Sequence, residues 1–490
     1  MGEEVPQRVF TRADRAEYRQ KVRRCLDVFA TLLRESRFDF DRPLTGLEIE
    51  LNLVDEQTGP AMRNAEALAA IADPSFQTEL GQFNVEINVA PRMLAARGLA
   101  EYETQVRASL NAADAAARGI GARMVMVGIL PTLRAEHLAG HTLSANPRYA
   151  LLNEQIFAAR GEDLHIDIDG VQRLTVTADT IMPEAACTST QLHLQVSPAQ
   201  FPAFWNAAQA IAGVQVALAA NAPFLLGRQL WAETRVPLFE QATDTRSEEI
   251  KAQGVRPRVW FGERWITSVF DLFEENVRYF PALLPILDPQ DPVAALADGQ
   301  TPTLAELRLH NGTIYRWNRP VYDVVAGRPH LRVENRVLPA GPTVLDTVAN
   351  AAFYFGLVRT LADAERPVWS QMSFSAAEEN FHQAARLGID AQLFWPGLGY
   401  LPATELVLRR LLPMAAEGLD RWDVAPAERD RLLEVIRRRC LSGANGASWQ
   451  ADTVRGLEEH HGLPREQALR TMLSAYVERM HSNVAVDLWD

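Results

Sequence analysis

The sequence predicts an α+β fold in which an antiparallel sheet is joined to a helical C-terminal region. Segments with strand character crowd into the part of the chain before Pro342. They do not alternate with helices in the βαβα order of a parallel sheet, so an antiparallel sheet is expected. Beyond Pro342 nearly every segment up to about residue 482 has apolar residues at helical spacing. We therefore expect a mixed domain over residues 1–345, opening with a helix, and a helical region over 346–490.

Helices are expected where apolar side chains recur every three or four residues. In the first of them, Tyr18, Val22, Leu26 and Phe29 have this spacing. The helices expected before Pro342 cover 12–36, 62–73, 99–118, 148–159 and 203–220.

Strands are expected where short segments alternate between polar and apolar residues or are continuously apolar. The first follows a turn marked by Pro43, and a connection rich in Pro, Asp and Gly at 288–303 precedes the last ones. The expected strands cover 46–54, 82–90, 122–130, 163–168, 171–177, 188–196, 304–309, 313–317 and 329–337.

Composition and charge exclude several classes of protein. The chain has 490 residues, of which 47% are hydrophobic and 23% charged, as in an ordinary globular protein. Its formal net charge of −13 argues against a general nucleic-acid binder, whose basic surface would dominate the count. No apolar segment approaches the ~20 residues of a membrane span. We expect small-molecule partners, with neither nucleic acid nor membrane among them.

Cysteine usage and the N-terminus indicate the compartment. Cys25, Cys187 and Cys440 are far apart and form no C-x-x-C motif, which fits a reducing environment and excludes a disulfide scaffold. The first eight residues are polar and carry no signal-peptide core. The expected location is the cytoplasm.

Two glutamates stand one residue apart in the apolar segment 46–54. On a strand, successive side chains point to opposite faces, so Glu48, Glu50 and Asn52 share one face. Neighbouring carboxylates repel each other unless a cation lies between them, and a hard cation such as Mg²⁺ prefers oxygen ligands. A strand with one solvated face would show the same pattern.

The pattern recurs on three further expected strands, each of which puts polar residues on one face. Any single strand is equally typical of a sheet with one wet side, but four together favour a sheet that lines a site for metal and anions. The residues concerned are Asn84, Glu86 and Asn88; Gln191, His193 and Gln195; and Arg332, Glu334 and Arg336.

Short motifs in a fixed order resemble one known family. The motifs extend from about residue 44 to 350, and their order and spacing make the match specific although each is weak alone. They are Gly46-Leu47-Glu48-Ile49-Glu50, Val85-Glu86-Ile87-Asn88, Gly128-Ile129-Leu130-Pro131, Asn146-Pro147-Arg148-Tyr149, Gln191-Leu192-His193-Leu194, Leu218-Ala219-Ala220-Asn221-Ala222-Pro223-Phe224, Trp317-Asn318-Arg319-Pro320 and Val333-Glu334-Asn335-Arg336. This set resembles the gamma-glutamylcysteine synthetases (glutamate–cysteine ligases), in particular the bacterial class 2 carboxylate–amine ligases.

The resemblance implies a glutamine-synthetase-like fold whose sheet surrounds ATP and two or three Mg²⁺ ions. It assigns Glu48, His193 and Glu334 to one ion and Glu50 and Glu86 to a second, with Glu79 as a further acidic ligand. It places Arg336 and Arg319 in catalysis, on the transferring phosphate or the substrate carboxylate. It assigns Arg235, Gln191 and Arg336 to binding of the nucleotide.

The chain departs from the family pattern at three places. Leu338-Pro339 stands where relatives carry an Asp shortly after the last arginine, and Gln82 stands where they often have a Glu. Leu331-Arg332 replaces the Gly-Thr that usually precedes the last Glu. These departures leave the metal set intact and leave the substrate open.

The expected activity is amide formation by an ATP- and Mg²⁺-dependent carboxylate–amine ligase through an acyl phosphate, with glutamate and cysteine as first candidates. A phosphate-binding loop and a Gly-x-Gly-x-x-Gly fingerprint are both missing from the sequence, which favours a nucleotide held through metal. Three alternatives stay open: the same chemistry on a different amine or amino acid, a non-catalytic nucleotide- or metabolite-binding regulatory protein on the same fold, and metal-dependent hydrolysis. The apolar stripes of the C-terminal helices suit internal packing or contact between copies in a homo-oligomer.

Overall fold

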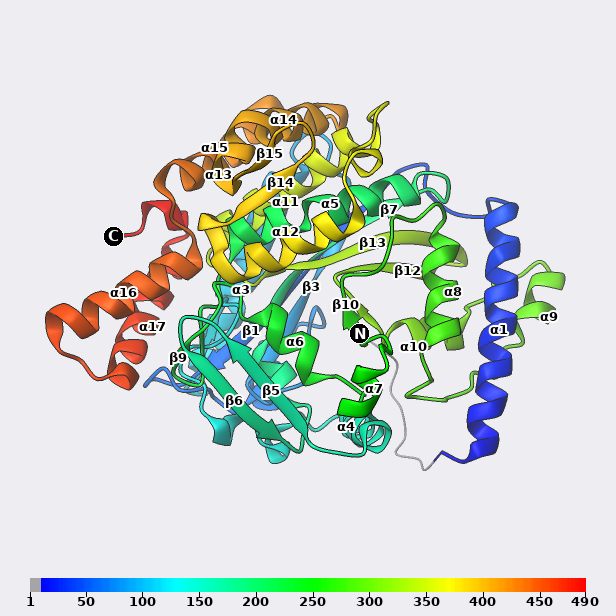
Figure 1. Cartoon of the computed structure of the whole chain (residues 1–490), viewed down its shortest axis with the longest axis horizontal. Helices are drawn as coiled ribbons and strands as arrows, with labels where there is room; N and C mark the ends of the chain where they lie inside the picture. The colour runs from blue at the N-terminus through cyan, green and yellow to red at the C-terminus, as the bar shows by residue number, and fades with distance from the viewer. Residues whose placement is uncertain (1–9) are drawn as a thin grey trace.

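The computed structural model describes residues 10–490 and contains a central antiparallel sheet (Figure 1). Its main strands run in the order β12-β13-β7-β1-β3-β2, and β4 pairs with the end of β1. The predicted polar N-terminal segment lies outside the described residues. The strands are β1 (Thr45–Val54), β2 (Phe76–Thr78), β3 (Asn84–Arg92), β4 (Arg123–Val125), β7 (Ser189–Val196), β12 (Asn318–Val325) and β13 (Arg328–Pro339).

The register of this sheet places the polar residues of neighbouring strands side by side. Glu50 of β1 lies opposite Glu86 of β3, and Glu48 lies opposite Gln191 of β7. His193 of β7 lies opposite Glu334 of β13. Because side chains alternate along each strand, this register gathers the four predicted polar faces on one side of the sheet.

Helix α5 (Phe201–Ala219) covers the opposite side of the sheet and is buried along almost its whole length (Figure 1). Buried amides fix it there: Gln215 Nε2 donates to Asn335 Oδ1 at 3.0 Å, and Asn318 Nδ2 donates to Gln209 Oε1 at 2.7 Å. Asn335 Nδ2 also donates to Asn318 Oδ1 at 2.8 Å, which ties β12 to β13. Since buried amides are costly when unpaired, this network specifies how α5 sits on the two strands.

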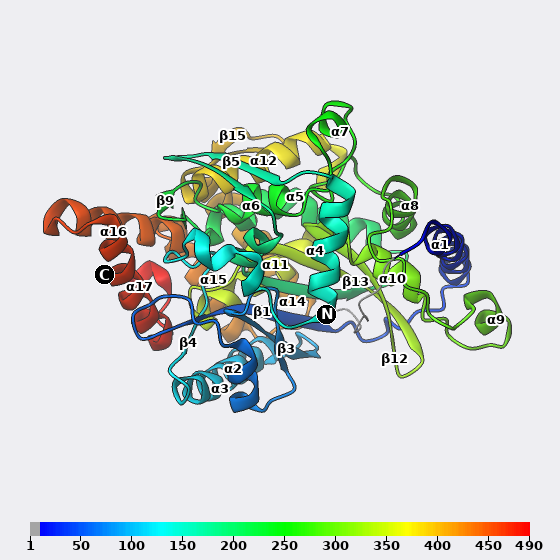
Figure 2. The ribbon, with the colours of Figure 1, turned by 90° about the horizontal axis from the view of Figure 1, so that it is seen from below.

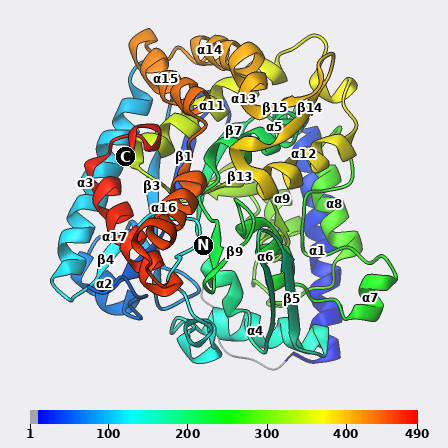
Figure 3. The same cartoon turned by 60° about the vertical axis from the view of Figure 1, so that its left-hand side comes forward.

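The helices after residue 343 form an outer layer over α5. Helix α11 (Val344–Ala362) packs against α5, α14 (Leu412–Arg421) and α15 (Pro426–Ser442). Helices α16 (Gly446–His461) and α17 (Arg465–Ser482) lie at the edge of the molecule, where the C-terminal end of α17 meets α3 (Gly98–Arg118) (Figure 3). Tyr476 of α17 donates to the carbonyl of Met126 at 2.7 Å. One continuous hydrophobic core extends from α1 to the C-terminus, and a domain boundary at 345/346 stays a prediction.

Helices α2 and α3 cover the β3 and β4 end of the sheet, and α3 lies on the same apolar side as α5 and α11. Helices α2 and α3 pack against β2, β3 and β4 (Figure 2).

The remaining helices are α1 (Arg12–Arg34), α2 (Asn64–Ile71), α4 (Pro147–Arg160), α6 (Arg235–Ala242), α7 (Glu248–Ala252), α8 (Val269–Tyr279), α9 (Pro292–Ala297), α10 (Ala305–Asn311), α12 (Phe374–Leu387) and α13 (Ala403–Leu406). The small two-stranded sheets are β5 (Leu164–Asp169) with β6 (Arg173–Ala178), β8 (Phe224–Leu225) with β9 (Arg228–Gln229), β10 (Val259–Trp260) with β11 (Tyr315–Arg316), and β14 (Gln392–Trp395) with β15 (Gly399–Pro402).

The predicted α+β class is confirmed, and the differences from prediction are local. The expected strand 304–309 is wrong, because this segment is helix α10, rich in helix-forming residues, with Leu307 and His310 buried. Of the expected strand 122–130 only β4 is paired. Strand β12 was not predicted, since Pro320 interrupts its pattern, although its place at the sheet edge tolerates proline. The hairpin β14–β15 was also not predicted. No helix in the described part of the chain combines the length and the apolar character needed to cross a membrane.

A buried ion pair anchors the outer helical layer. Arg439 of α15 donates to Asp346 Oδ1 at 2.8 Å and to Asn350 Oδ1 at 2.7 Å, both on α11. We predict that Arg439→Ala lowers the free energy of unfolding by roughly 3–5 kcal/mol, because Asp346 is left buried without its partner. Urea denaturation measures this change. The control Arg437→Ala, on the exposed face of the same helix beside Glu434, should change it by less than ~1 kcal/mol. Equal effects of the two substitutions would contradict the anchoring role.

Candidate active site

The polar side of the sheet faces a large pocket of about 560 Å³. Strands β1, β3, β7, β12 and β13 supply one wall, and α4, α6, α8 and α10 supply residues of the others. His193 is the one predicted site residue that does not line this pocket. The predicted site residues that line it are Glu48, Glu50, Glu79, Glu86, Gln191, Arg235, Arg319, Glu334 and Arg336.

Three carboxylates converge at one end of the pocket. Glu50 on β1, Glu86 on β3 and Glu79 just after β2 each offer an oxygen atom, and these atoms lie within 4.8 Å of one another. Glu50 accepts from the Ser189 amide at 2.6 Å and from Gln191 Nε2 at 3.0 Å. None of the three forms a salt bridge with another residue of the described range 10–490. We call this set the carboxylate triad.

Burial and mutual repulsion make the charged form of this triad costly. Burial, followed by the charge of Glu50, raises the pKa of Glu79 to about 8. Burial, followed by Glu48 and Glu79, raises the pKa of Glu86 well above its usual range. Burial also raises the pKa of Glu50, against the opposing effect of Arg336. Three converging carboxylates that form no salt bridge with any described residue fit a hard divalent cation such as Mg²⁺.

Glu334 and Glu48, two other glutamates on the polar face of the sheet, already have partners. Glu334 accepts from Arg319 at 2.9 and 3.1 Å and from Arg336 at 2.6 Å. Although burial opposes it, the charges of Arg319 and Arg336 lower the pKa of Glu334 far below its usual range. Glu48 Oε1 lies 3.0 Å from Nε2 of His193.

The resemblance assigned Glu48, His193 and Glu334 to an ion separate from that of Glu50 and Glu86. The ligand atoms of these three do not form another converging group in the described part of the chain. Their assignment to a metal stays a prediction, and the contacts above favour a different role.

Two arginines lie between these acidic sets and the rest of the pocket. Arg336 of β13 donates to Gln191 Oε1 at 2.8 Å as well as to Glu334, which holds its guanidinium in the middle of the sheet. Arg235, at the start of α6, donates to Glu233 Oε1 at 3.3 Å and to the carbonyl of Val337 at 3.5 Å. The Nε atoms of Arg235 and Arg336 have no hydrogen-bond partner in the structure. Their positions suit recognition of an anion beside the carboxylate triad.

Sequence reasoning missed Glu184, which lines the same pocket from the short 3₁₀ helix Met182–Ala186. Its Oε2 atom is buried without a hydrogen-bond partner. Burial, followed by the charge of Glu79, raises the pKa of Glu184 to about 8. No strand alternation surrounds Glu184, so the sequence carried no signal for it. Arg148 and Tyr149 of α4 also line the pocket; their motif was noted, but no role was expected for them.

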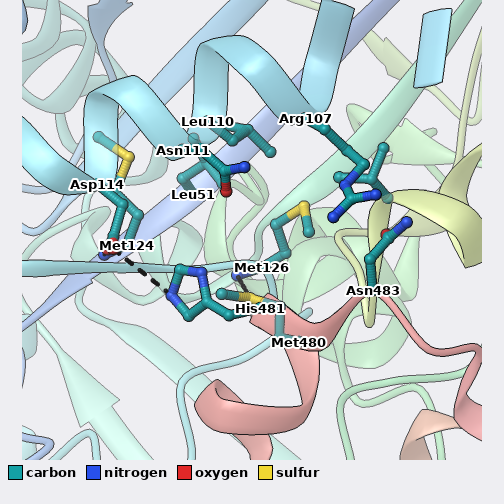
Figure 4. Close-up of a pocket in the computed structure, with 11 residues that line it drawn as sticks. Leu51, Arg107, Leu110, Asn111, Asp114, Met124, Met126, Met480, His481 and Asn483 are labelled. Atoms are coloured by element: carbon teal, nitrogen blue, oxygen red, sulfur yellow. Dashed lines mark hydrogen bonds and ion pairs between the residues drawn. The ribbon is translucent and has the colours of Figure 1, made fainter. Parts of the chain in front are cut away.

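A second cavity, of about 30 Å³, lies between α3, β4 and α17 (Figure 4). Its walls are mostly apolar, with Leu51, Met124 and Met480 among them, and His481 Nε2 lies 3.6 Å from Asp114 Oδ2. Leu51 points away from the face that carries Glu50. This cavity has room for little more than a water molecule and no converging carboxylates, so it is not the candidate active site.

Divalent metal should stabilise the protein through the carboxylate triad. At a Mg²⁺ or Mn²⁺ concentration of 100 times Kd the free energy of unfolding should rise by ~3 kcal/mol, seen as a higher midpoint in a thermal melt. Glu86→Gln should abolish this increase while leaving the metal-free protein at least as stable, because a neutral amide removes repulsion. The control Glu101→Gln makes the same change at a side chain that is 68% exposed and should keep the full response. A full metal response in Glu86→Gln would remove Glu86 from the site.

Metal binding should also release protons. With the pKa of Glu79 raised to about 8, this carboxyl is still largely protonated at pH 7 in the metal-free fold. Protons and metal therefore compete, and metal affinity should rise with pH from about 6 to 8 and level off above that range. Calorimetry at pH 7 in two buffers of different ionisation enthalpy should show release of about one proton or more per ion. Binding without proton release at pH 7 would contradict the raised pKa.

Comparison with known proteins places this chain in a family. The family model for glutamate-cysteine ligase family 2 (GCS2) matches residues 44–469. A protein of Paenarthrobacter aurescens (strain TC1), provisionally named glutamate–cysteine ligase 2-1, is 24% identical over 371 residues, covering 72% of this chain and 76% of that protein.

A solved structure shows the same fold. The crystal structure of the glutamate–cysteine ligase (gshA) of Francisella tularensis in complex with AMP superposes with a TM-score of 0.55 at 12% identity, over 91% of this chain and 90% of that chain. The predicted glutamine-synthetase-like fold, an antiparallel sheet beneath the site with helices outside, is thereby confirmed. The chain belongs to glutamate–cysteine ligase family 2 and is an ATP-dependent carboxylate–amine ligase.

Proposed function

We propose that this enzyme uses ATP and Mg²⁺ to join the γ-carboxylate of L-glutamate to the amino group of L-cysteine, forming γ-glutamylcysteine through an acyl phosphate. The observation that carries this proposal is the carboxylate triad, which forms no salt bridge within residues 10–490 and lies beside Arg336 and Arg235 in one pocket. The carboxylate triad suits a cation as its ligand, and the two arginines suit a polyanion. The family and the AMP bound to the Francisella tularensis enzyme support a nucleotide as the polyanion.

The reaction needs activation because a carboxylate is a poor acyl donor. In the first step a carboxylate oxygen attacks the γ-phosphorus of ATP, the bond from that phosphorus to the bridging oxygen breaks, and ADP leaves. In the second step the neutral amine attacks the acyl carbon, phosphate leaves, and the nitrogen loses a proton. Phosphoryl transfer depends on position and charge neutralisation more than on covalent help from the protein.

The residues of the sheet meet these demands in distinct ways. Glu50, Glu79 and Glu86 hold the divalent ion, which when bound neutralises phosphate oxygens. Arg336 contacts the transferring phosphoryl group, for which its planar guanidinium provides paired N–H donors. Arg336 needs no large movement for this, because Gln191 and Glu334 already hold it in place.

Three further residues bind the reactants. Arg319 lies on the edge strand β12 and is oriented by Glu334. Together with Arg235 of α6, it binds phosphate or the carboxylate of the acid substrate. Gln191 belongs to the nucleotide site through its contact with Arg336. All three line the pocket.

A different amine is the second candidate, favoured by the departures from the family pattern. Gln82 donates to the carbonyls of His141 and Leu143, so it holds a loop in place of presenting a carboxylate. Leu338 and Pro339 pair with Thr190 and Ser189 of β7. Arg332 lines the pocket where relatives usually carry a small residue. These changes alter the pocket wall without removing the carboxylate triad.

The test is ADP release from ATP and Mg²⁺ with L-glutamate, with and without L-cysteine or a panel of other amines, with mass spectrometry of the products. We expect ADP release that depends on the amine, with one amide product per active amine. Release with L-cysteine identifies γ-glutamylcysteine synthesis, and release with another amine alone supports the second candidate. ATP binding without ADP release in any mixture would favour a regulatory protein, and product formation without ATP would favour hydrolysis.

Arg336→Ala should lower kcat by about 10³-fold or more, since a guanidinium on a transferring phosphoryl group contributes about 10³–10⁵ in rate. Arg336→Lys keeps the charge but loses the paired donors, so its kcat should lie between those of the wild type and of Arg336→Ala. The control Arg437→Ala should retain normal turnover, and circular dichroism checks that each variant is folded. Turnover near normal in a folded Arg336→Ala enzyme would reject this role.

A further inference from the structure

Arg332 of β13 makes an unusual set of contacts at the pocket wall. Its Nε donates to Nδ1 of His193 at 3.0 Å, and its Nη1 donates to Oδ2 of Asp323 at 3.2 Å. The same Nη1 lies 3.1 Å from Nε2 of His330. Asp323 is fixed from its other side by Arg308 at 2.9 Å. Arg332 is therefore held from two neighbouring strands and is itself only 24% exposed.

The contact with Arg332 determines which nitrogen of His193 carries the proton. A neutral imidazole has one N–H and one lone pair, and an arginine Nε always carries hydrogen. The lone pair of His193 must therefore lie on Nδ1, where it accepts from Arg332. The hydrogen then lies on Nε2, the atom that faces Glu48 Oε1 at 3.0 Å.

This arrangement leaves no lone pair on His193 for a metal ion. A histidine that ligates a metal offers the lone pair of one nitrogen and usually donates the N–H of the other to a carboxylate or a carbonyl. In this chain the atom that faces the carboxylate is the one with hydrogen, and the other nitrogen is occupied by a guanidinium. His193 also does not line the pocket.

Fixed charges divide the sheet into two halves. On one half the carboxylates of Glu334 and Asp323 are paired with arginines, and Glu48 faces the Nε2–H of His193. On the other half, the carboxylate triad forms no salt bridge with any residue that the structure describes. Among the described residues, the carboxylate triad therefore has less compensating positive charge than Glu334 and Asp323.

We propose that Arg332 stands in for a second metal ion. It occupies Nδ1 of His193 and leaves Nε2–H facing Glu48, so that no lone pair of His193 is available to an ion between Glu48 and Glu334. The nucleotide-free enzyme then binds one divalent cation, at Glu50, Glu79 and Glu86. Arg332 is a positioning residue that sets the number of metal ions. This inference rests on the proposed function only for the location of the first ion.

The test counts Mn²⁺ ions bound per chain without nucleotide, from the loss of the free-ion signal in electron paramagnetic resonance. Because it needs no turnover, its result is independent of whether the proposed substrates are right. We expect about one ion for the wild type and none for Glu86→Gln. His193→Gln should keep about one ion, because glutamine can accept from Arg332 and donate to Glu48.

Removing Arg332 should open the second site. Arg332→Ala frees Nδ1 to carry the hydrogen, so Nε2 can offer a lone pair beside Glu48 and Glu334, and about two ions should bind. The double variant Arg332→Ala/His193→Ala should return to about one. Two ions on the wild type, with one lost in His193→Gln, would overturn the proposal. So would a folded Arg332→Ala protein that still binds one ion, and if that variant does not fold, the wild type and His193→Gln decide the question.

Discussion

Repulsion among Glu50, Glu79 and Glu86 is the constraint on which the rest of the site depends. The pairing of β1 with β3 sets Glu50 directly opposite Glu86, and the end of β2 brings Glu79 beside them. A sheet that buries three carboxylates together loses stability unless a cation joins them, because desolvation and like charge both disfavour the ionised form. The same feature that makes the metal-free site costly makes it selective for a hard divalent ion.

The remainder of the fold holds this costly arrangement in place. The amides of Gln209 and Gln215 bind α5 to the back of β12 and β13, on the side away from the pocket. Outside α5, the pair of Asp346 and Arg439 joins the C-terminal helices to the same core. A rigid sheet backed by two helical layers can present fixed guanidinium groups to one half of the pocket and unneutralised carboxylates to the other. Positioning of this kind is the main contribution that phosphoryl transfer requires from a protein.

Much of the sheet could be predicted from the sequence, because alternation on a strand is a local property. The shared face of Glu48 and Glu50, and that of Glu86 and Asn88, followed directly from period-two patterning. The register could not be predicted this way, so the sequence did not show that Glu50 meets Glu86 while Glu48 meets His193. Glu79 was expected only from the family resemblance, since it lies beyond the end of a strand of three residues.

The residues that sequence reasoning missed have non-local partners or irregular backbones. Glu184 lies on a 3₁₀ turn that no periodicity marks. The role of Arg332 depends on Asp323 of β12, a strand hidden by Pro320, and on a histidine about 140 residues earlier in the chain. Segment 304–309 was misjudged because Leu307 and Leu309 alternate with polar residues as on a strand, whereas packing against α1 and α8 selects the helix.

The most direct test of a divalent ion on the carboxylate triad is an anomalous difference map from crystals of the enzyme grown with Mn²⁺. The account predicts a strong peak enclosed by Glu50, Glu79 and Glu86, at oxygen distances of about 2.0–2.3 Å. A map with no peak at these residues, or with its main peak between Glu48, His193 and Glu334, would contradict it.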